Sequence, residues 1–107
     1  MDERQLTGQV VLVGYGRIGR RVARLLDEAR VPHVIAEQKR DAVEELRKAG
    51  KPAVAGDAAE AGVLIQAHIA RVAVLIITTP DTLASRRMVD TARALNPRIA
   101  VALVVPN

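Results

Sequence analysis

Three glycines stand close together directly after the apolar run 9–13. A Gly-x-Gly-x-x-Gly loop between a strand and a helix is typical of phosphate binding. Its first glycine makes the turn, its second lets a phosphate approach the backbone, and its third lets the helix pack on the sheet. The first helical turn then offers N–H groups to an anion. We therefore predict a phosphate site, with an empty tight turn as the alternative, at Gly14, Tyr15, Gly16, Arg17, Ile18 and Gly19.

Four arginines accompany these glycines on the same predicted helix. Arg17 lies inside the loop, where it adds positive charge at the position of a phosphate. Arg20, Arg21 and Arg24 lie further along the helix. Charged stripes of this kind usually face solvent, so we interpret these three arginines as solvated or facing a partner.

An acidic residue, Glu37, ends the second apolar run, about 20 residues after the loop. A carboxylate there accepts hydrogen bonds from ribose hydroxyls, with Gln38 beside it, and its charge repels a 2′-phosphate. We therefore expect AMP, ATP or NAD(H) rather than NADP. Lys39 and Arg40 follow, either as exposed helix-start residues or as partners of a phosphate. The alternative for Glu37 is a solvated carboxylate at a strand end.

Two further strand ends carry polar side chains. Asp57 either hydrogen-bonds an adenine amino group or caps the helix that follows. Thr78, Thr79 and Pro80 precede Asp81, a candidate helix cap, and either face the same crevice or serve as turn and cap residues. His33 and His68 have no second ligand at metal-binding spacing. With no catalytic arrangement and no metal site in view, we expect a binding module rather than an enzyme.

The remaining pattern alternates apolar runs with amphipathic stretches. We expect strands at 9–13, 32–37, 52–56, 72–77 and 98–105, and helices at 17–30, 40–50, 58–69 and 81–96. In the first helix we expect five apolar residues to face inward, Ile18, Val22, Leu25, Leu26 and Ala29. Apolar strands between helices indicate a parallel sheet covered on both faces. The predicted fold is α/β: a Rossmann-like, doubly wound, five-stranded parallel sheet of order 3-2-1-4-5.

Composition excludes several classes of protein. The chain has 107 residues, which fit a single domain, 1–107. It has no cysteine, which excludes disulfides and thiolate metal sites and is compatible with the cytoplasm. With one tyrosine and no Phe or Trp, it lacks the aromatic residues on which single-stranded nucleic acids stack. No apolar run is long enough for membrane insertion, and residues 1–9 do not form a signal peptide.

Three long stretches together carry a family resemblance. "VVLVGYGRIGRRVARLL", "VIAEQKRDAVEELRKAGKPAVAGDAAEAGVLIQAHI" and "AVLIITTPDTLASRRMVDTARALNP" resemble the N-terminal domain of the regulator of potassium conductance family. This family is also described as the TrkA N-terminal, NAD-binding type. Within it, the chain most resembles the cytosolic domains of Kef-type potassium–proton antiporters. The resemblance runs from about residue 9 to about residue 104.

The resemblance implies an adenine nucleotide or dinucleotide bound at the switch point of the sheet. It implies phosphates at the loop 14–19, the ribose at Glu37 and Gln38, the adenine near Asp57 and Ala58, and a wall formed by 78–80. It further implies a homodimer whose ligand signal passes to a membrane channel or antiporter.

Family members usually continue beyond the fifth strand with a helix and a sixth strand, so we expect a domain truncated at its C-terminus. This interpretation leaves an excised fragment, a stand-alone subunit and an engineered minimal unit open. Two other functions share the same residues. One is the nucleotide-binding half of an NAD-dependent oxidoreductase, which needs a substrate domain. The other is a scaffold with an empty loop.

Overall fold

The computed structural model describes residues 9–105, so residues 1–8, for which the sequence predicts no signal peptide, lie outside it. In chain order the described elements are β1 (Val10–Val13), α2 (Arg17–Glu28), β2 (His33–Glu37), α3 (Arg40–Lys48), β3 (Ala53–Ala55), α4 (Ala61–Gln66), the 3-10 helix η1 (Ile69–Arg71), β4 (Val74–Ile77), α5 (Thr82–Leu95) and β5 (Ala100–Leu103). Within residues 9–105 no helix combines the length and apolar character needed to cross a membrane.

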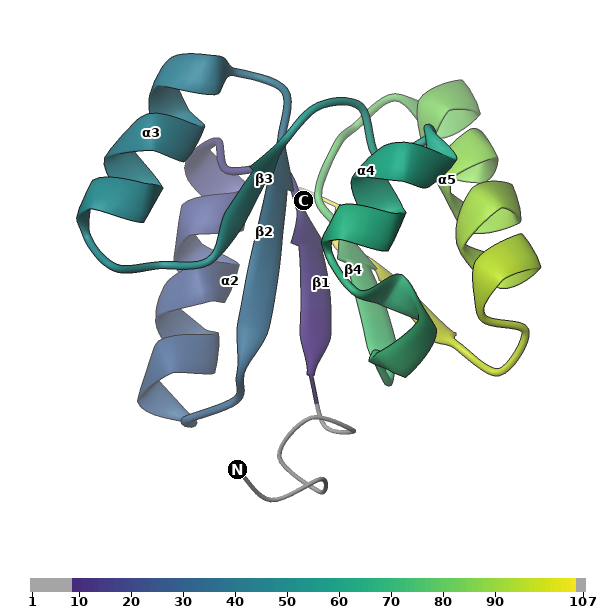
Figure 1. The fold of residues 1–107 in the computed structure, drawn as a ribbon, viewed down its shortest axis with the longest axis horizontal. Helices are drawn as coiled ribbons and strands as arrows, with labels where there is room; N and C mark the ends of the chain where they lie inside the picture. Colours follow the sequence, from purple (N-terminus) through teal and green to yellow (C-terminus); the bar gives the residue numbers. More distant parts are fainter. Residues whose placement is uncertain (1–8, 106–107) are drawn as a thin grey trace.

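The sheet has the order β3-β2-β1-β4-β5, and each pair of neighbours runs parallel. This order confirms the predicted doubly wound topology. Helices α2 and α3 lie on one side of the sheet, and α4 and α5 lie on the other (Figure 1). All strands therefore end at one edge, where β1 and β2 point upward in Figure 1.

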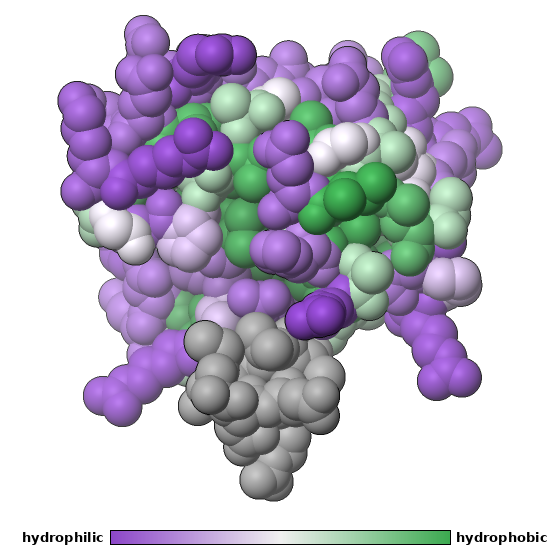
Figure 2. Space-filling model, viewed as in Figure 1, coloured by the Kyte–Doolittle hydropathy of each residue, from purple (hydrophilic) through white to green (hydrophobic). Residues whose placement is uncertain are grey.

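Alternate residues of the central strands form two separate apolar cores. Leu12 and Ile35 pack against α2 and α3, whereas Val11 and Val13 pack on the side of α4 and α5. This alternation follows from the twofold period of a strand. The outer surface is mostly hydrophilic over α3, while apolar side chains gather over α4, where Ile65 is 57% exposed (Figure 2).

The prediction of one helix over 58–69 was wrong. The Asp57 carboxylate accepts a hydrogen bond from the Ala59 amide at 2.8 Å, which holds a turn and delays the helix to Ala61. His68 then adopts a left-handed conformation with φ of 60°, and the chain continues as η1. The other predicted elements differ from the observed ones by a few residues at their ends.

The inward face of α2 also differs from the prediction. Leu25 is 63% exposed and Ala29 is exposed, whereas Gly19 and Ala23 are buried. Gly19 and Ala23 are four residues apart and so lie on one helical face. Because these small residues let the helix axis lie close to the sheet, that face turns inward and Leu25 turns outward.

A hydrogen-bonded asparagine joins the end of α5 to η1. The Asn96 amide donates to the carbonyls of Ile69 and Val72, both at 2.9 Å, and the Asn96 Oδ1 accepts from the Arg98 amide at 3.3 Å. These bonds satisfy carbonyls in the irregular segment between α4 and β4.

We predict that Asn96→Ala lowers the free energy of unfolding by about 1 to 3 kcal/mol, because the Val72 carbonyl loses the Asn96 donor and the Ile69 carbonyl keeps only the Val72 amide. Urea unfolding followed by circular dichroism measures this change. Asn96→Asp keeps the acceptor for Arg98 but places a carboxylate against both carbonyls, so it should be at least as destabilising. An Asp variant as stable as the parent chain would contradict this role.

Candidate functional site

Three loops meet at the edge where the strands end. The Gly14 amide donates to the Ala36 carbonyl at 2.9 Å, and the Thr78 amide donates to the Val13 carbonyl at 3.0 Å. The Gly56 amide extends the pattern to the end of β2 by donating to the Glu37 carbonyl at 3.0 Å. The sheet ladder therefore continues one residue beyond each strand and fixes the starts of these loops relative to one another.

Gly14 and Gly19 are required by packing. Gly14 has a φ of +97°, and a Cβ on it would overlap the Thr78 hydroxyl, which itself donates to the Val13 carbonyl at 2.7 Å. A Cβ on Gly19 would overlap the Gly14 carbonyl. The start of α2 therefore lies against the β1 loop and Thr78, as the roles predicted for the first and third glycines require.

Gly16, unlike Gly14 and Gly19, is not required by packing. A Cβ on Gly16 would meet no atom of the described part of the chain within 4 Å, and the residue is the N-cap of α2 in an extended conformation. No side chain among the described residues caps this helix, and its first turn holds no acidic residue. The N-terminus of α2 thus opens onto free space, and no residue of α2 itself offsets its positive dipole end, which favours an anion.

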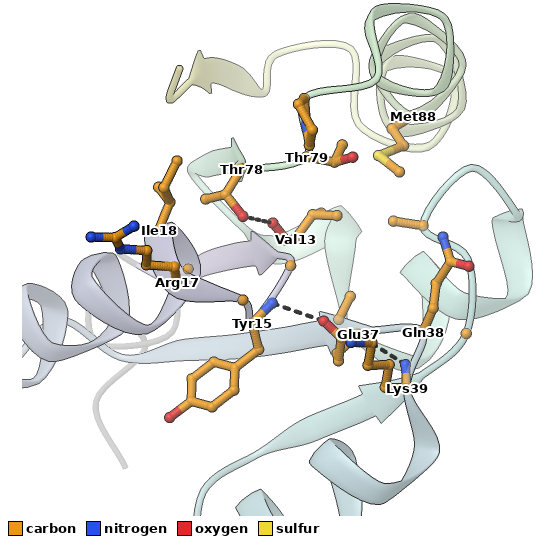
Figure 3. Close-up of a pocket in the computed structure, with 17 residues that line it drawn as sticks. Val13, Tyr15, Arg17, Ile18, Glu37, Gln38, Lys39, Thr78, Thr79 and Met88 are labelled. Atoms are coloured by element: carbon orange, nitrogen blue, oxygen red, sulfur yellow. Dashed lines mark hydrogen bonds between the residues drawn. The ribbon is translucent and has the colours of Figure 1, made fainter. Parts of the chain in front are cut away.

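This free space belongs to a cavity of about 520 Å³ at the ends of β1, β2 and β4 (Figure 3). Twelve of the thirteen predicted site residues line it: Gly14, Tyr15, Gly16, Arg17, Ile18, Gly19, Glu37, Gln38, Ala58, Thr78, Thr79 and Pro80. Figure 3 shows Arg17 and Ile18 at one end and Gln38 and Met88 at the other. The cavity therefore runs from the start of α2 to the loops after β2 and β3.

Asp57 is the predicted residue that the cavity lining does not include. Its carboxylate is used in the turn with Ala59, and the N-cap of α4 is Glu60. Local turn chemistry thus accounts for Asp57, although it does not cap the helix as expected. Asp81 does cap α5, because its Oδ1 accepts from the Ala84 amide at 3.0 Å.

The Glu37 carboxylate joins two loops. Its Oε1 accepts from the Tyr15 amide at 2.8 Å, and its Oε2 accepts from the Lys39 amide at 2.6 Å (Figure 3). Sequence reasoning assigned Glu37 to a ribose and did not foresee these backbone donors. Because a carboxylate has about four lone-pair positions, each oxygen can still accept a second hydrogen bond from the cavity.

Tyr15 and Arg20 contact each other on the outer side of the loop. The Arg20 guanidinium carbon lies 5.3 Å from the centre of the Tyr15 ring, and Arg20 Nε donates to the Tyr15 carbonyl at 3.4 Å. Figure 3 shows the Tyr15 ring pointing away from Thr78 and Met88. Tyr15 therefore contributes its backbone to the Glu37 bond and its side chain to the arginine face of α2.

Five lining residues lie outside the predicted set of site residues: Val13, Ala36, Lys39, Gly56 and Met88. For Lys39 the sequence left a phosphate partner open as an alternative. Val13 and Ala36 are register partners near the ends of β1 and β2, so the sheet topology could have identified them. Met88 lies in the middle of α5, and no motif in the sequence points to it. It reaches the cavity because α5 packs across the sheet behind Thr79.

Neither histidine contributes to this cavity. His33 Nδ1 donates to the Val31 carbonyl at 2.9 Å, and its Nε2 lies 3.8 Å from the Asp27 carboxylate at the opposite edge of the sheet. His68 lies in the turn before η1. Among residues 9–105, no group of three His, Cys, Asp or Glu side chains is placed to hold a metal ion.

The family model for the TrkA-N domain matches residues 10–106. The putative cation/proton antiporter YbaL of Escherichia coli is 36% identical over 90% of this chain, and the putative K(+) efflux antiporter KefB of Alkalimonas amylolytica is 30% identical over 94%. The glutathione-regulated potassium-efflux system protein KefC of Cronobacter sakazakii is 31% identical over 94%. The chain spans only 17%, 15% and 16% of these three proteins.

Solved structures agree with this match. The TrkA-N domain of the E. coli inner membrane protein YbaL superposes with a TM-score of 0.88 at 35% identity, covering 94% of this chain and 74% of that one. The Kef C-terminal domain of Shewanella denitrificans in its AMP-bound form has a TM-score of 0.77 at 23% identity, covering 89% and 56%. The GsuK channel bound to NAD has a TM-score of 0.79 at 22% identity, covering 94% and 18%.

The last two likenesses show the shared fold alone, whereas the family model and the YbaL domain also match in sequence. The matched residues include the glycine loop, Glu37 and the ends of β3 and β4. From this match and this fold, the chain belongs to the TrkA-N domain family.

Proposed function

We propose that this chain is a nucleotide-sensing regulatory domain of a cation transport system, and that it binds AMP, ATP or NAD(H) in the cavity at the end of the sheet. The observation that carries this proposal is the open space at Gly16. Two glycines of the loop are explained by packing, but no contact among residues 9–105 requires a glycine at the third position, Gly16. A ligand phosphate above the N-terminus of α2 would need the space that a side chain at Gly16 would fill, which explains the glycine.

The rest of the cavity fits the other parts of an adenine nucleotide. Glu37 faces the cavity between the phosphate end and the loop after β3, with lone pairs available for ribose hydroxyls. Gln38 and Ala58 border the far end, where an adenine would lie. We retain Asp57 only as a backbone neighbour of the adenine, since its carboxylate already serves the turn.

Relatives and structural neighbours supply the context for regulation. Antiporters and potassium-efflux proteins contain domains similar to this chain, and neighbours with the same fold have been solved with AMP, ADP or NAD. We therefore propose a cytoplasmic role in which a bound nucleotide changes the state of a membrane transport domain. A sensing role needs no catalytic group, and we propose none.

We also propose that two copies of the chain pair through the β5 side of the sheet. β5 is an edge strand, and Ala100, Ala102 and Leu103 on it are exposed. Leu83 and Val105 add exposed apolar area, at 68% and 70% exposure. Within residues 9–105 no strand pairs with the outer edge of β5, and an apolar edge of this kind favours pairing with a second copy.

We predict that Gly16→Ala weakens AMP and NAD binding about tenfold or more, because its methyl group would occupy the position of a phosphate. The melting temperature without ligand should stay unchanged, since the methyl group meets no protein atom. Isothermal titration with AMP, ATP, NAD, NADH and NADP measures binding. Saturation at 100 times the dissociation constant should also stabilise the parent chain by about 2.7 kcal/mol.

Gly62→Ala is the matched control, because a Cβ at Gly62 also meets open space and Gly62 does not line the cavity. It should bind nucleotides like the parent chain. Gly19→Ala should instead lower stability, because its methyl group meets the Gly14 backbone. Equal nucleotide affinity in Gly16→Ala and Gly62→Ala, or no binding by the parent chain, would refute the proposed site.

Glu37 should set the preference between NAD and NADP. We predict that the parent chain binds NAD more tightly than NADP, and that Glu37→Gln narrows the ratio about tenfold by removing the charge that repels a 2′-phosphate. Glu37→Gln should also lower the unfolding free energy by about 1 kcal/mol, because an amide cannot accept from both the Tyr15 and Lys39 amides.

The NAD-to-NADP ratio measures this preference independently of the fraction folded. Glu28→Gln removes the same charge from the exposed end of α2, outside the cavity, and should leave the ratio unchanged. An unchanged ratio in Glu37→Gln would mean that Glu37 serves only to hold the two loops.

A further inference from the structure

A second hollow lies beside the cavity, between the start of α2 and the start of α3. It has a volume of about 590 Å³. Its charged lining consists of five basic side chains, Arg17, Arg20, Arg21, Arg24 and Lys39, and one acidic side chain, Glu37. We call this hollow the basic groove. Five basic side chains face one carboxylate, so the groove carries a net positive charge.

The arrangement of the groove arginines destabilises helix α2. Their spacing along α2 is i, i+3, i+4 and i+7, which places like charges next to each other on one face. Arg17 and Arg20 also lie in the first turn of the helix, where the dipole disfavours cations. Among residues 9–105, the ion pairs join Asp27 to His33 and to Lys51, and none involves a basic residue of the groove.

Repulsion between like charges is expected at a site where a bound anion compensates for it. The groove shares Tyr15, Gly16, Arg17, Glu37 and Lys39 with the nucleotide cavity, so the two hollows adjoin at the predicted phosphate position and at the predicted ribose position. Helical side chains lean toward the N-terminus of their helix, so Arg21 and Arg24 lean toward this junction. Arg20 contacts the Tyr15 ring and donates to the Tyr15 carbonyl at the same place.

We propose that the basic groove is a second phosphate subsite, which takes a phosphate group beyond the one held by the glycine loop. This inference rests on the proposed nucleotide site and specifies which nucleotides fill it best: those with a further phosphate. The extra group comes either from a longer 5′-phosphate chain passing over Gly16 or from a phosphate on the ribose. Because Glu37 disfavours a ribose phosphate, the 5′ chain is the expected source.

The test compares a double variant, Arg21→Gln with Arg24→Gln, with a charge-matched control, Arg86→Gln with Arg87→Gln. Arg21 and Arg24 line the groove but not the nucleotide cavity, and Arg86 and Arg87 are exposed on α5 across the sheet. Titrations with AMP, ADP, ATP, NAD and NADP at low and high salt give the affinities. Inorganic tripolyphosphate, followed by NMR shifts of backbone amides, probes the groove without a nucleoside.

In the parent chain, affinity should rise about tenfold from AMP to ATP, and the rise should shrink at high salt. The groove variant (Arg21→Gln with Arg24→Gln) should bind ATP no more tightly than AMP, with its AMP affinity unchanged. The control variant should keep the higher affinity for ATP. The groove variant should also melt at a higher temperature than the parent chain without ligand, because repulsion along α2 is relieved. If the parent chain binds NADP more tightly than NAD, and the groove variant loses this difference, the extra phosphate is the one on the ribose.

Two results would overturn the subsite: equal affinities for AMP and ATP in the parent chain, or a rise from AMP to ATP that survives in the groove variant. If both double variants lose AMP affinity and ATP affinity to the same extent, the cause is the overall charge of the chain. This result would also reject the subsite. If no nucleotide binds, the proposed function fails. Tripolyphosphate shifts along 15–24 that vanish in the groove variant would still support the groove as a phosphate site.

Discussion

The close approach of α2 to the β1 loop is the constraint on which the site depends. A side chain at Gly14 would overlap Thr78, and a side chain at Gly19 would overlap the Gly14 carbonyl. The approach of β1, α2 and the end of β4 therefore requires glycine at both positions. The contact brings the first turn of α2 directly above the strand ends. It also aims the positive end of the helix dipole into the cavity rather than into solvent.

The Glu37 carboxylate completes this arrangement from the neighbouring strand. By accepting from the amides of Tyr15 and Lys39, it ties the loop after β1 to the loop after β2. An anion belongs at this corner even without a ligand, because the starts of α2 and α3 both point there and neither is capped by its own side chain. The same carboxylate therefore serves the fold, through its backbone donors, and faces the cavity with its remaining lone pairs.

The sequence predicted the sheet order and most of the cavity lining because both follow from short patterns. Val11, Leu12 and their neighbours form a continuous apolar run, and a glycine loop follows it, so the switch point was fixed. The errors fall where tertiary contacts decide. Leu25 fits the helical period but faces outward because Gly19 and Ala23 bring the opposite face of α2 close to the sheet. The predicted helix 58–69 begins late because of the Asp57 turn and breaks at the left-handed His68. Met88 reaches the cavity only through helix packing, which no local pattern encodes.

The position of the cavity explains how a small ligand can influence a whole domain. Its walls come from the loops after β1, β2 and β4, and from Met88 of α5, so they belong to both layers of helices. A nucleotide in this place would touch Gly16 on the α2 side and Thr79 on the α5 side at the same time. Because β5 and the exposed residues around it are attached to the second layer, a ligand that fixes α5 against α2 also fixes the surface proposed for pairing. The binding proposed at the strand ends and the pairing proposed at the sheet edge would then be linked through β4, which hydrogen-bonds to β1 on one side and to β5 on the other.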